Sequence, residues 1–163
     1  MRANYRYCLI VFLFLWSCIK PLPDEELTMK KTPYIGTEIQ MDGYYSVFDK
    51  DYNQYSNLIF YSNGILLSFS YSKEYADFYR DKKIINLIRD TKERWNLYQI
   101  SNDSIAIQGW TLNNNYQYVI KNIKAKIIND TTISLKSVKN ESWISYHFKR
   151  FSPKPDSTNV FIK

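Results

Sequence analysis

The feature that most constrains the fold is a series of short stretches in which apolar and polar residues alternate, separated by turns rich in Asn and Asp. The clearest pair lies at 55–61 and 65–71, on either side of Asn63-Gly64. Asn-Gly between two apolar runs is the strongest short-range signal for a β-hairpin. The apolar residues of the second stretch recur with a period of two, which is typical of a strand with one buried face. The chain is therefore predicted to build an antiparallel sheet from hairpins.

The same pattern predicts further strands at 44–48, 95–100, 104–110, 116–128, 132–136 and 143–151. Residues 73–90 change to a helical period, with Tyr75 and Ile85 on one face, and predict a single helix. Roughly eight consecutive antiparallel strands with short connections favour a closed barrel or a tightly curved sheet. We therefore expect a mainly β fold, an up-and-down meander closed as a barrel, with one helix inserted after the third strand.

An apolar segment near the N-terminus predicts export. Arg2 and Arg6 precede an unbroken apolar run over residues 8–16. A basic start, an apolar run of about 7–15 residues and a small residue at the cleavage point describe a secretory signal, whereas a membrane-spanning helix needs about 20 apolar residues. We therefore expect residues 1–17 to be a cleaved signal peptide.

Leu15-Trp16-Ser17-Cys18 follows this run and resembles the lipobox of bacterial lipoproteins, in which Leu and two mostly small residues precede Cys. The resemblance implies cleavage before Cys18, diacylglycerol on its sulfur and a further acyl chain on the new amino group. Two or more acyl chains anchor a protein stably in a membrane. Because Ile19 is not Asp, the resemblance also favours the outer membrane within the cell envelope. An ordinary signal peptide, with Cys18 incidental, is the alternative.

The rest of the chain divides into a tether, one domain and a tail. Residues 18–35 are rich in proline and mixed charge and predict a tether between the lipid and the domain. Residues 36–151 are expected to form the domain and 152–163 an extended tail, of which residues 152–157 are exposed. The Gly43-x-Tyr45 opening and the meander resemble the lipocalin-like domains of bacterial lipoproteins. The first functional hypothesis is a lipocalin-like barrel that binds a small hydrophobic molecule, with the helix as a lid or plug at one end.

Large apolar side chains are predicted to face the interior. An eight-stranded barrel is just wide enough to be filled by side chains or to hold one small ligand. We expect these groups to fill most of the lumen, and any pocket that remains to be apolar with tyrosine hydroxyls at its mouth. The predicted ligand-binding residues are the aromatic members Tyr45, Phe60, Phe69, Tyr98, Tyr146 and Phe148. The other predicted inward residues are Leu58, Ile65, Leu67, Ile100, Ile105, Ile107, Ile133, Leu135 and Ile144.

No catalytic or metal-binding constellation is recognisable in the sequence. His147 is the only histidine, and the lipidated Cys18 would be the only cysteine left after cleavage, so a catalytic triad or a zinc site lacks partners. Asp49 and Asp51 lie in a loop without the spacing of an EF-hand. We therefore expect a non-enzymatic protein without a metal or cofactor. A hydrolase whose carboxylates meet only in the fold is the alternative.

Charge and surface aromatics bear on the partners. The net charge of +6 falls to +4 when the leader with its two arginines is removed, and the remaining charge is spread along the chain. Nucleic-acid binding needs a basic patch or run, so no nucleic acid is expected. A second hypothesis is an accessory or structural lipoprotein that binds a protein or glycan partner. Its contact surface would be the outward aromatics Trp95, Trp110, Tyr116 and Trp143.

Overall fold

Eight β-strands make up most of the computed structural model, which describes residues 23–79, 82–137 and 141–163. The strands are β1 (Gly43–Asp49), β2 (Gln54–Phe60), β3 (Ile65–Tyr71), β4 (Trp95–Ser101), β5 (Ser104–Leu112), β6 (Tyr118–Asn129), β7 (Thr132–Lys136) and β8 (Trp143–Arg150). Helices α2 (Tyr75–Phe78) and α3 (Lys82–Arg89) and the 3-10 helix η1 (Lys92–Arg94) lie between β3 and β4. The fold is mainly β, and the predicted helical stretch is divided into two short α-helices.

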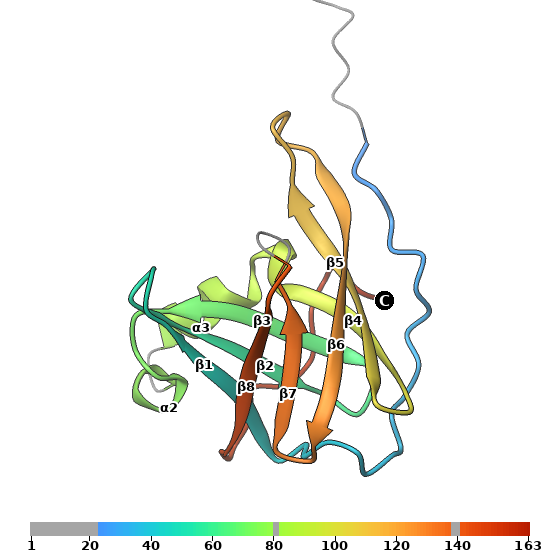
Figure 1. The fold of residues 1–163 in the computed structure, drawn as a ribbon. Helices are drawn as coiled ribbons and strands as arrows, with labels where there is room; N and C mark the ends of the chain where they lie inside the picture. The colour runs from blue at the N-terminus through green and yellow to red at the C-terminus, as the bar shows by residue number, and fades with distance from the viewer. Residues whose placement is uncertain (1–22, 80–81, 138–140) are drawn as a thin grey trace, which may run out of the picture.

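Each strand pairs antiparallel with the next, and β8 pairs with β1 to close the barrel (Figure 1). The closing register places Tyr45 opposite Phe148. The β5–β6 hairpin pairs from Ser104 with Lys126 to Leu112 with Tyr118 and projects beyond its neighbours (Figure 1). Closure gives every strand two bonded neighbours and so removes exposed edges. The predicted antiparallel meander closed into a barrel is confirmed.

Asn and Gly residues make the tight turns. Gly64, between β2 and β3, has φ of +84°, and Asn102, between β4 and β5, has φ of 53°. At the tip of the β5–β6 hairpin, Oδ1 of Asn113 accepts the N–H groups of Asn115 and Gln117. Asn tolerates positive φ and bonds nearby backbone, so it can take the place of glycine in a glycine-poor chain.

The barrel has two different ends. The closed end carries the β2–β3, β4–β5 and β6–β7 turns, and the open end carries the β1–β2, β3–β4, β5–β6 and β7–β8 connections. Residues 34–42 pass beneath the closed end before β1 begins (Figure 1). Ile39 from this segment is only 3% exposed and packs into the interior cluster. The segment therefore plugs the lumen from below.

Two apolar clusters occupy opposite faces of the sheet. The lumen cluster receives side chains from all eight strands, and paired residues such as Tyr45 and Leu58 share it. The outer cluster lies on the outside of β1–β5. β3 contributes to both, because Leu66 faces the lumen while its neighbours face out. The prediction that Ile65, Leu67 and Phe69 face inward is therefore wrong: these residues lie in the outer cluster.

The two helices explain why the outer face of β3 is apolar. Tyr75 of α2 and Ile88 of α3 are buried in the outer cluster. The Tyr75 ring contacts Phe69 at 5.6 Å and Tyr44 at 5.1 Å between centroids. The helices thus cover the side of the barrel (Figure 1). The expectation that the helix plugs or lids the lumen is wrong, because its apolar face is used against the outer surface of the sheet.

Residues 24–34 form a strap along the outside of the barrel (Figure 1). Glu25 N–H donates to the carbonyl of Tyr118 at 2.9 Å, and at the other end Tyr34 N–H donates to the carbonyl of Ser62 at 2.7 Å. Between them, Oε1 of Gln108 accepts the N–H groups of Thr28 and Met29 at 2.8 and 2.7 Å. Most of the stretch expected to be a tether is thus docked on the domain.

The C-terminal tail also packs on the barrel. Ile162 is buried in the outer cluster, and Arg89 of α3 pairs with Asp156 at 3.1 Å. The Nζ atom of Lys154 donates to the carbonyls of Met41 and Phe60. Within the stretch expected to be exposed, Asp156 is exposed whereas Lys154 is half-buried, and Ile162 farther along the tail covers apolar surface of the barrel.

The predicted signal peptide and Cys18 lie outside the described residues. Within residues 23–79, 82–137 and 141–163, no helix has the length and apolar character needed to cross a membrane.

Candidate functional site: the open mouth of the barrel

The lower part of the lumen is filled by aromatic rings. Phe60 contacts Tyr45 at 5.7 Å and Tyr98 at 4.9 Å, both edge to face, and Tyr45 contacts Phe148 at 5.4 Å. Edge-to-face contacts of this kind stabilise a packed core beyond simple burial. The packing agrees with the expectation that large side chains fill much of the interior.

The buried hydroxyls in this layer are tied to backbone groups. The hydroxyl of Tyr45 donates to the carbonyl of Asp130 at 2.7 Å and accepts the N–H of Gln40 at 2.9 Å. The Tyr98 hydroxyl donates to the carbonyl of Tyr61 at 2.8 Å. Burial raises the pKa of Tyr45 to about 12 and also raises the pKa of Tyr98. These bonds fix both hydroxyl groups at the closed end of the barrel.

At the open end, a hollow of about 340 Å³ remains between β1, β2, β3 and β8. The lumen-facing residues that line it are Val47, Ser56, Ser70, Ile144 and Tyr146. Its rim is formed by Phe48 and the charged β1–β2 loop residues Asp49, Lys50 and Asp51. The hollow therefore combines aliphatic, hydroxyl and charged groups.

Hydroxyl groups dominate the β2–β3 side of the hollow. The Tyr146 hydroxyl donates to Oγ of Ser56 at 3.1 Å, and Oγ of Ser70 lies 3.5 Å from the same atom. Oδ1 of Asp49 accepts backbone N–H groups of its own loop, including that of Asp51 at 2.9 Å. That carboxylate therefore shapes the loop as well as charging the rim.

The opposite wall of the mouth carries a cation that sequence reasoning missed. On β4, β5 and β6, the register aligns Asn96, Gly109 and Lys121, and this row faces the lumen because Tyr98 and Ile107 lie on the same faces of their strands. Lys121 is half-buried. Burial lowers the pKa of its ammonium group. The alternation of β6 could have revealed this lysine, because residues two apart in a strand face the same side and Ile123 and Ala125 face the lumen.

The predicted ligand-binding residues are distributed unevenly around the site. Tyr45, Phe60, Tyr98 and Phe148 lie in the packed lower lumen, and Tyr146 lines the hollow. Phe69 lies outside the barrel, beneath α2, so its predicted inward position is wrong. The sequence therefore located most of the lumen, including Ile144 and Tyr146 of the hollow, but did not identify Lys121 on the opposite wall.

The predicted aromatic platform does not form. Trp95 and Trp110 are buried in the outer cluster, with their Nε1–H groups donating to the carbonyls of Arg89 and Glu25. Tyr116, at the hairpin tip, and Trp143, on β8, remain exposed. The burial of both tryptophans removes the centre of the proposed platform.

The remaining candidate groups stand apart. His147 is exposed on the outer face of β8, with Nδ1 3.5 Å from Oγ1 of Thr132. Across the part of the chain that the structure describes, no three His, Cys, Asp or Glu side chains gather in a way that could hold a metal ion.

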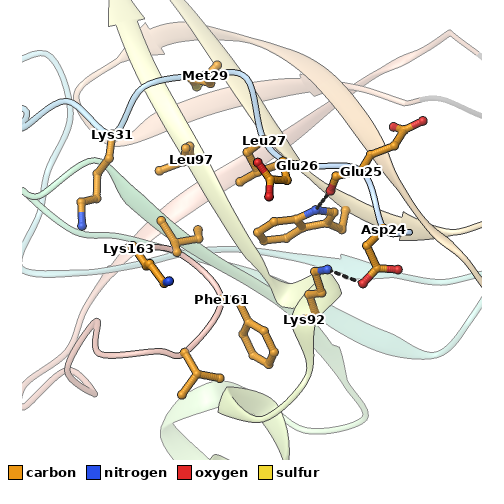
Figure 2. A pocket seen from close by; sticks show the side chains of 13 residues that line it. Asp24, Glu25, Glu26, Leu27, Met29, Lys31, Lys92, Leu97, Phe161 and Lys163 are labelled. Carbon is orange, nitrogen blue, oxygen red and sulfur yellow. Dashed lines mark hydrogen bonds and ion pairs between the residues drawn. The ribbon is translucent and has the colours of Figure 1, made fainter. Parts of the chain in front are cut away.

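A second hollow, of about 550 Å³, lies outside the barrel between the strap and the tail (Figure 2). Lys92 lies at its base, 2.7 Å from Asp24 and over the rings of Trp110 and Tyr118 at 4.8 and 4.6 Å. The Trp110 indole N–H donates to the Glu25 carbonyl at 2.8 Å. Because Lys92 and Trp110 already have partners within the chain, we interpret this groove as the contact surface between the strap and the barrel.

No protein-family model, curated protein or solved structure matches this chain. The structure itself shows an eight-stranded antiparallel β-barrel domain.

Proposed function

We propose that this protein is a non-enzymatic, lipid-anchored exported barrel that binds a small molecule with an apolar body at its open mouth. The observation that carries the proposal is the 340 Å³ hollow, because it is lined by lumen-facing residues while Ile39 plugs the other end. Small-molecule sites are concave, mostly apolar and of about 300–1,000 Å³. The hollow is at the lower end of that range, which favours a short ligand.

The lining favours an amphipathic ligand over a purely apolar one. Ile144 and Val47 offer aliphatic surface, whereas Ser56 and Ser70 offer hydroxyls within the same hollow. A few polar groups in an apolar pocket commonly fix the orientation of a ligand. The ligand is therefore a short molecule with one polar end.

The anchor supplies the setting for this function. Cys18 carries the lipid in the proposal, and the strap begins six residues later at Asp24. Because the strap is docked on β5 and β6, only residues 18–23 would separate the barrel from the membrane. The domain would then work close to the lipid surface, at the outer membrane.

Ligand binding is tested by nuclear magnetic resonance titration of the full chain with eight-carbon amphipaths of different head groups. We expect shifts at Ser70, Ile144 and Tyr146, and loss of binding in Ser70→Leu, which fills the hollow. Ser104→Leu is the matched control, because Ser104 is exposed on the outer face of β5 at the other end of the barrel. Shifts confined to the outer groove, or no binding at millimolar concentrations, would contradict the proposal.

A further inference from the structure

The mouth of the barrel has a charge asymmetry that the hollow alone does not show. Asp49 and Asp51 belong to the β1–β2 loop, whereas Lys121 belongs to β6. In a closed barrel of eight strands, strands four places apart face each other across the lumen. β6 therefore lies opposite β2, next to the loop that joins β1 to β2. The carboxylates and the ammonium group thus occupy opposite sides of the same opening.

The β5 partner of Lys121 carries no side chain. Gly109 pairs with Lys121 on one side and with Asn96 on the other. The Asn96 side chain lies over Gly109 with its Oδ1 atom, while its Nδ2 group donates to Oγ of Ser68 at 2.9 Å and to the carbonyl of Arg94 at 3.0 Å. No hydrogen bond joins the Asn96 amide to Lys121, so the ammonium group on this lumen-facing row has no partner in Asn96.

Arg94, the last residue of η1, directly precedes β4 at the open end of the barrel, and like Lys121 it lacks an anionic partner among the described residues. Among the described residues, the ammonium group of Lys121 and the guanidinium group of Arg94 form no hydrogen bond or ion pair. Both side chains are half-buried, and burial lowers both pKa values. Glu93 is the carboxylate that acts on both, and it lies too far away to pair with either. Partly desolvated cations without a partner are costly, and a bound anion would offset that cost.

We propose that Lys121, assisted by the positive potential of Arg94 at the same rim, binds the acidic head group of an anionic amphipath whose apolar body lies against Ile144 and Tyr146. This inference rests on the proposed function and names the class of its ligand. The carboxylates of Asp49 and Asp51 on the far side orient the ligand, because they repel its head group toward β6. The head group contributes a charge-assisted hydrogen bond, which is stronger than a neutral one.

The test compares octanoate, octan-1-ol and octyltrimethylammonium binding to the full chain by magnetic resonance titration. We expect octanoate to bind about tenfold or more tightly than octanol, and the cationic probe to bind most weakly. Lys121→Met should remove the advantage of octanoate and leave octanol binding unchanged. Lys121→Arg should keep the advantage, and Lys124→Met, on the exposed outer face of the same strand, should leave it unaltered.

The outcomes separate the two proposals. Equal binding of octanoate and octanol, unaffected by Lys121→Met, would overturn the assignment of an anionic ligand while leaving the mouth as a binding site. Binding of none of the three probes would overturn both. Acetate serves to identify the source of any charge effect: acetate binding as tight as that of octanoate would show a site for free small anions and would contradict the amphipath.

Discussion

An ideal Cβ atom on Gly109 would overlap Oδ1 of Asn96, its register partner on β4. The Asn96 side chain is almost fully buried, and its Nδ2 group donates to the carbonyl of Leu66 and to Oγ of Ser68 on β3. The amide therefore lies across the missing side chain of Gly109 while it bonds β4 to β3. β3 and β4 have fewer register pairs than any other neighbouring strands, only from Ile65 to Leu67 on the β3 side. The Asn96 side chain therefore adds hydrogen bonds where the backbone pairing is shortest.

Gly109→Ala is expected to destabilise the protein by about 1–3 kcal/mol, because the added methyl group must displace a buried, bonded amide. Urea unfolding monitored by circular dichroism measures the change. In the background of Asn96→Ala, the same substitution should cost much less, since nothing then occupies the space. Strict additivity of the two single effects would contradict the proposed contact.

Gln108→Leu is expected to release the strap from the barrel. Oε1 of Gln108 accepts two backbone N–H groups, from Thr28 and Met29, and an unsatisfied group of this kind costs about 1–3 kcal/mol. Hydrogen exchange should accelerate at both amides while the lumen residues stay protected. Gln99→Leu is the control, because Gln99 also bonds the strap, at Lys30, but is exposed and so should change exchange little. Equal exchange rates in the two variants would show that the strap does not depend on Gln108.

Stability should fall as the pH rises above about 10, partly through Tyr45. Its pKa is raised by burial from 10 to about 12, so the folded state holds the proton more tightly than the unfolded state does. The stabilisation is complete below pH 10 and is lost as the pH rises toward 12. Tyr45→Phe should be less stable at pH 7, because it lacks the bonds to Asp130 and Gln40, and should lose less stability than the original protein over this interval. Parallel pH profiles for the two proteins, from thermal unfolding, would contradict this role.

Cys18 is expected to carry the lipid. Labelled palmitate should enter the protein in bacterial cells, and Cys18→Ser should abolish labelling and move the protein from the membrane to the soluble fraction. The thiol of Cys8 lies in the expected leader, so Cys8→Ser is the matched control and should change neither property. The proposed lipid anchor would be contradicted if palmitate does not label the protein and if Cys18→Ser leaves its fractionation unchanged.

Much of the barrel could be predicted because its signals are local. Alternation in residues such as Ile105 and Ile107, and turns such as Asn63-Gly64, depend on neighbours along the chain. The inward position of Tyr45, Tyr98 and Tyr146 followed from the same period. β3 was assigned to the wrong face because its most apolar face is covered by helices, and alternation marks a buried face without saying on which side of the sheet it lies.

The sequence by itself determined the number, order and antiparallel pairing of the strands, because hairpin turns and a period of two are written in short stretches of residues. Only the tertiary structure decided what covers each face: the strap on β5, the helices on β3 and the plug at Ile39. It also brought Lys121 and the hollow beside Ile144 to one opening. These relations join residues far apart in the chain, so the local patterns that predicted the strands do not contain them.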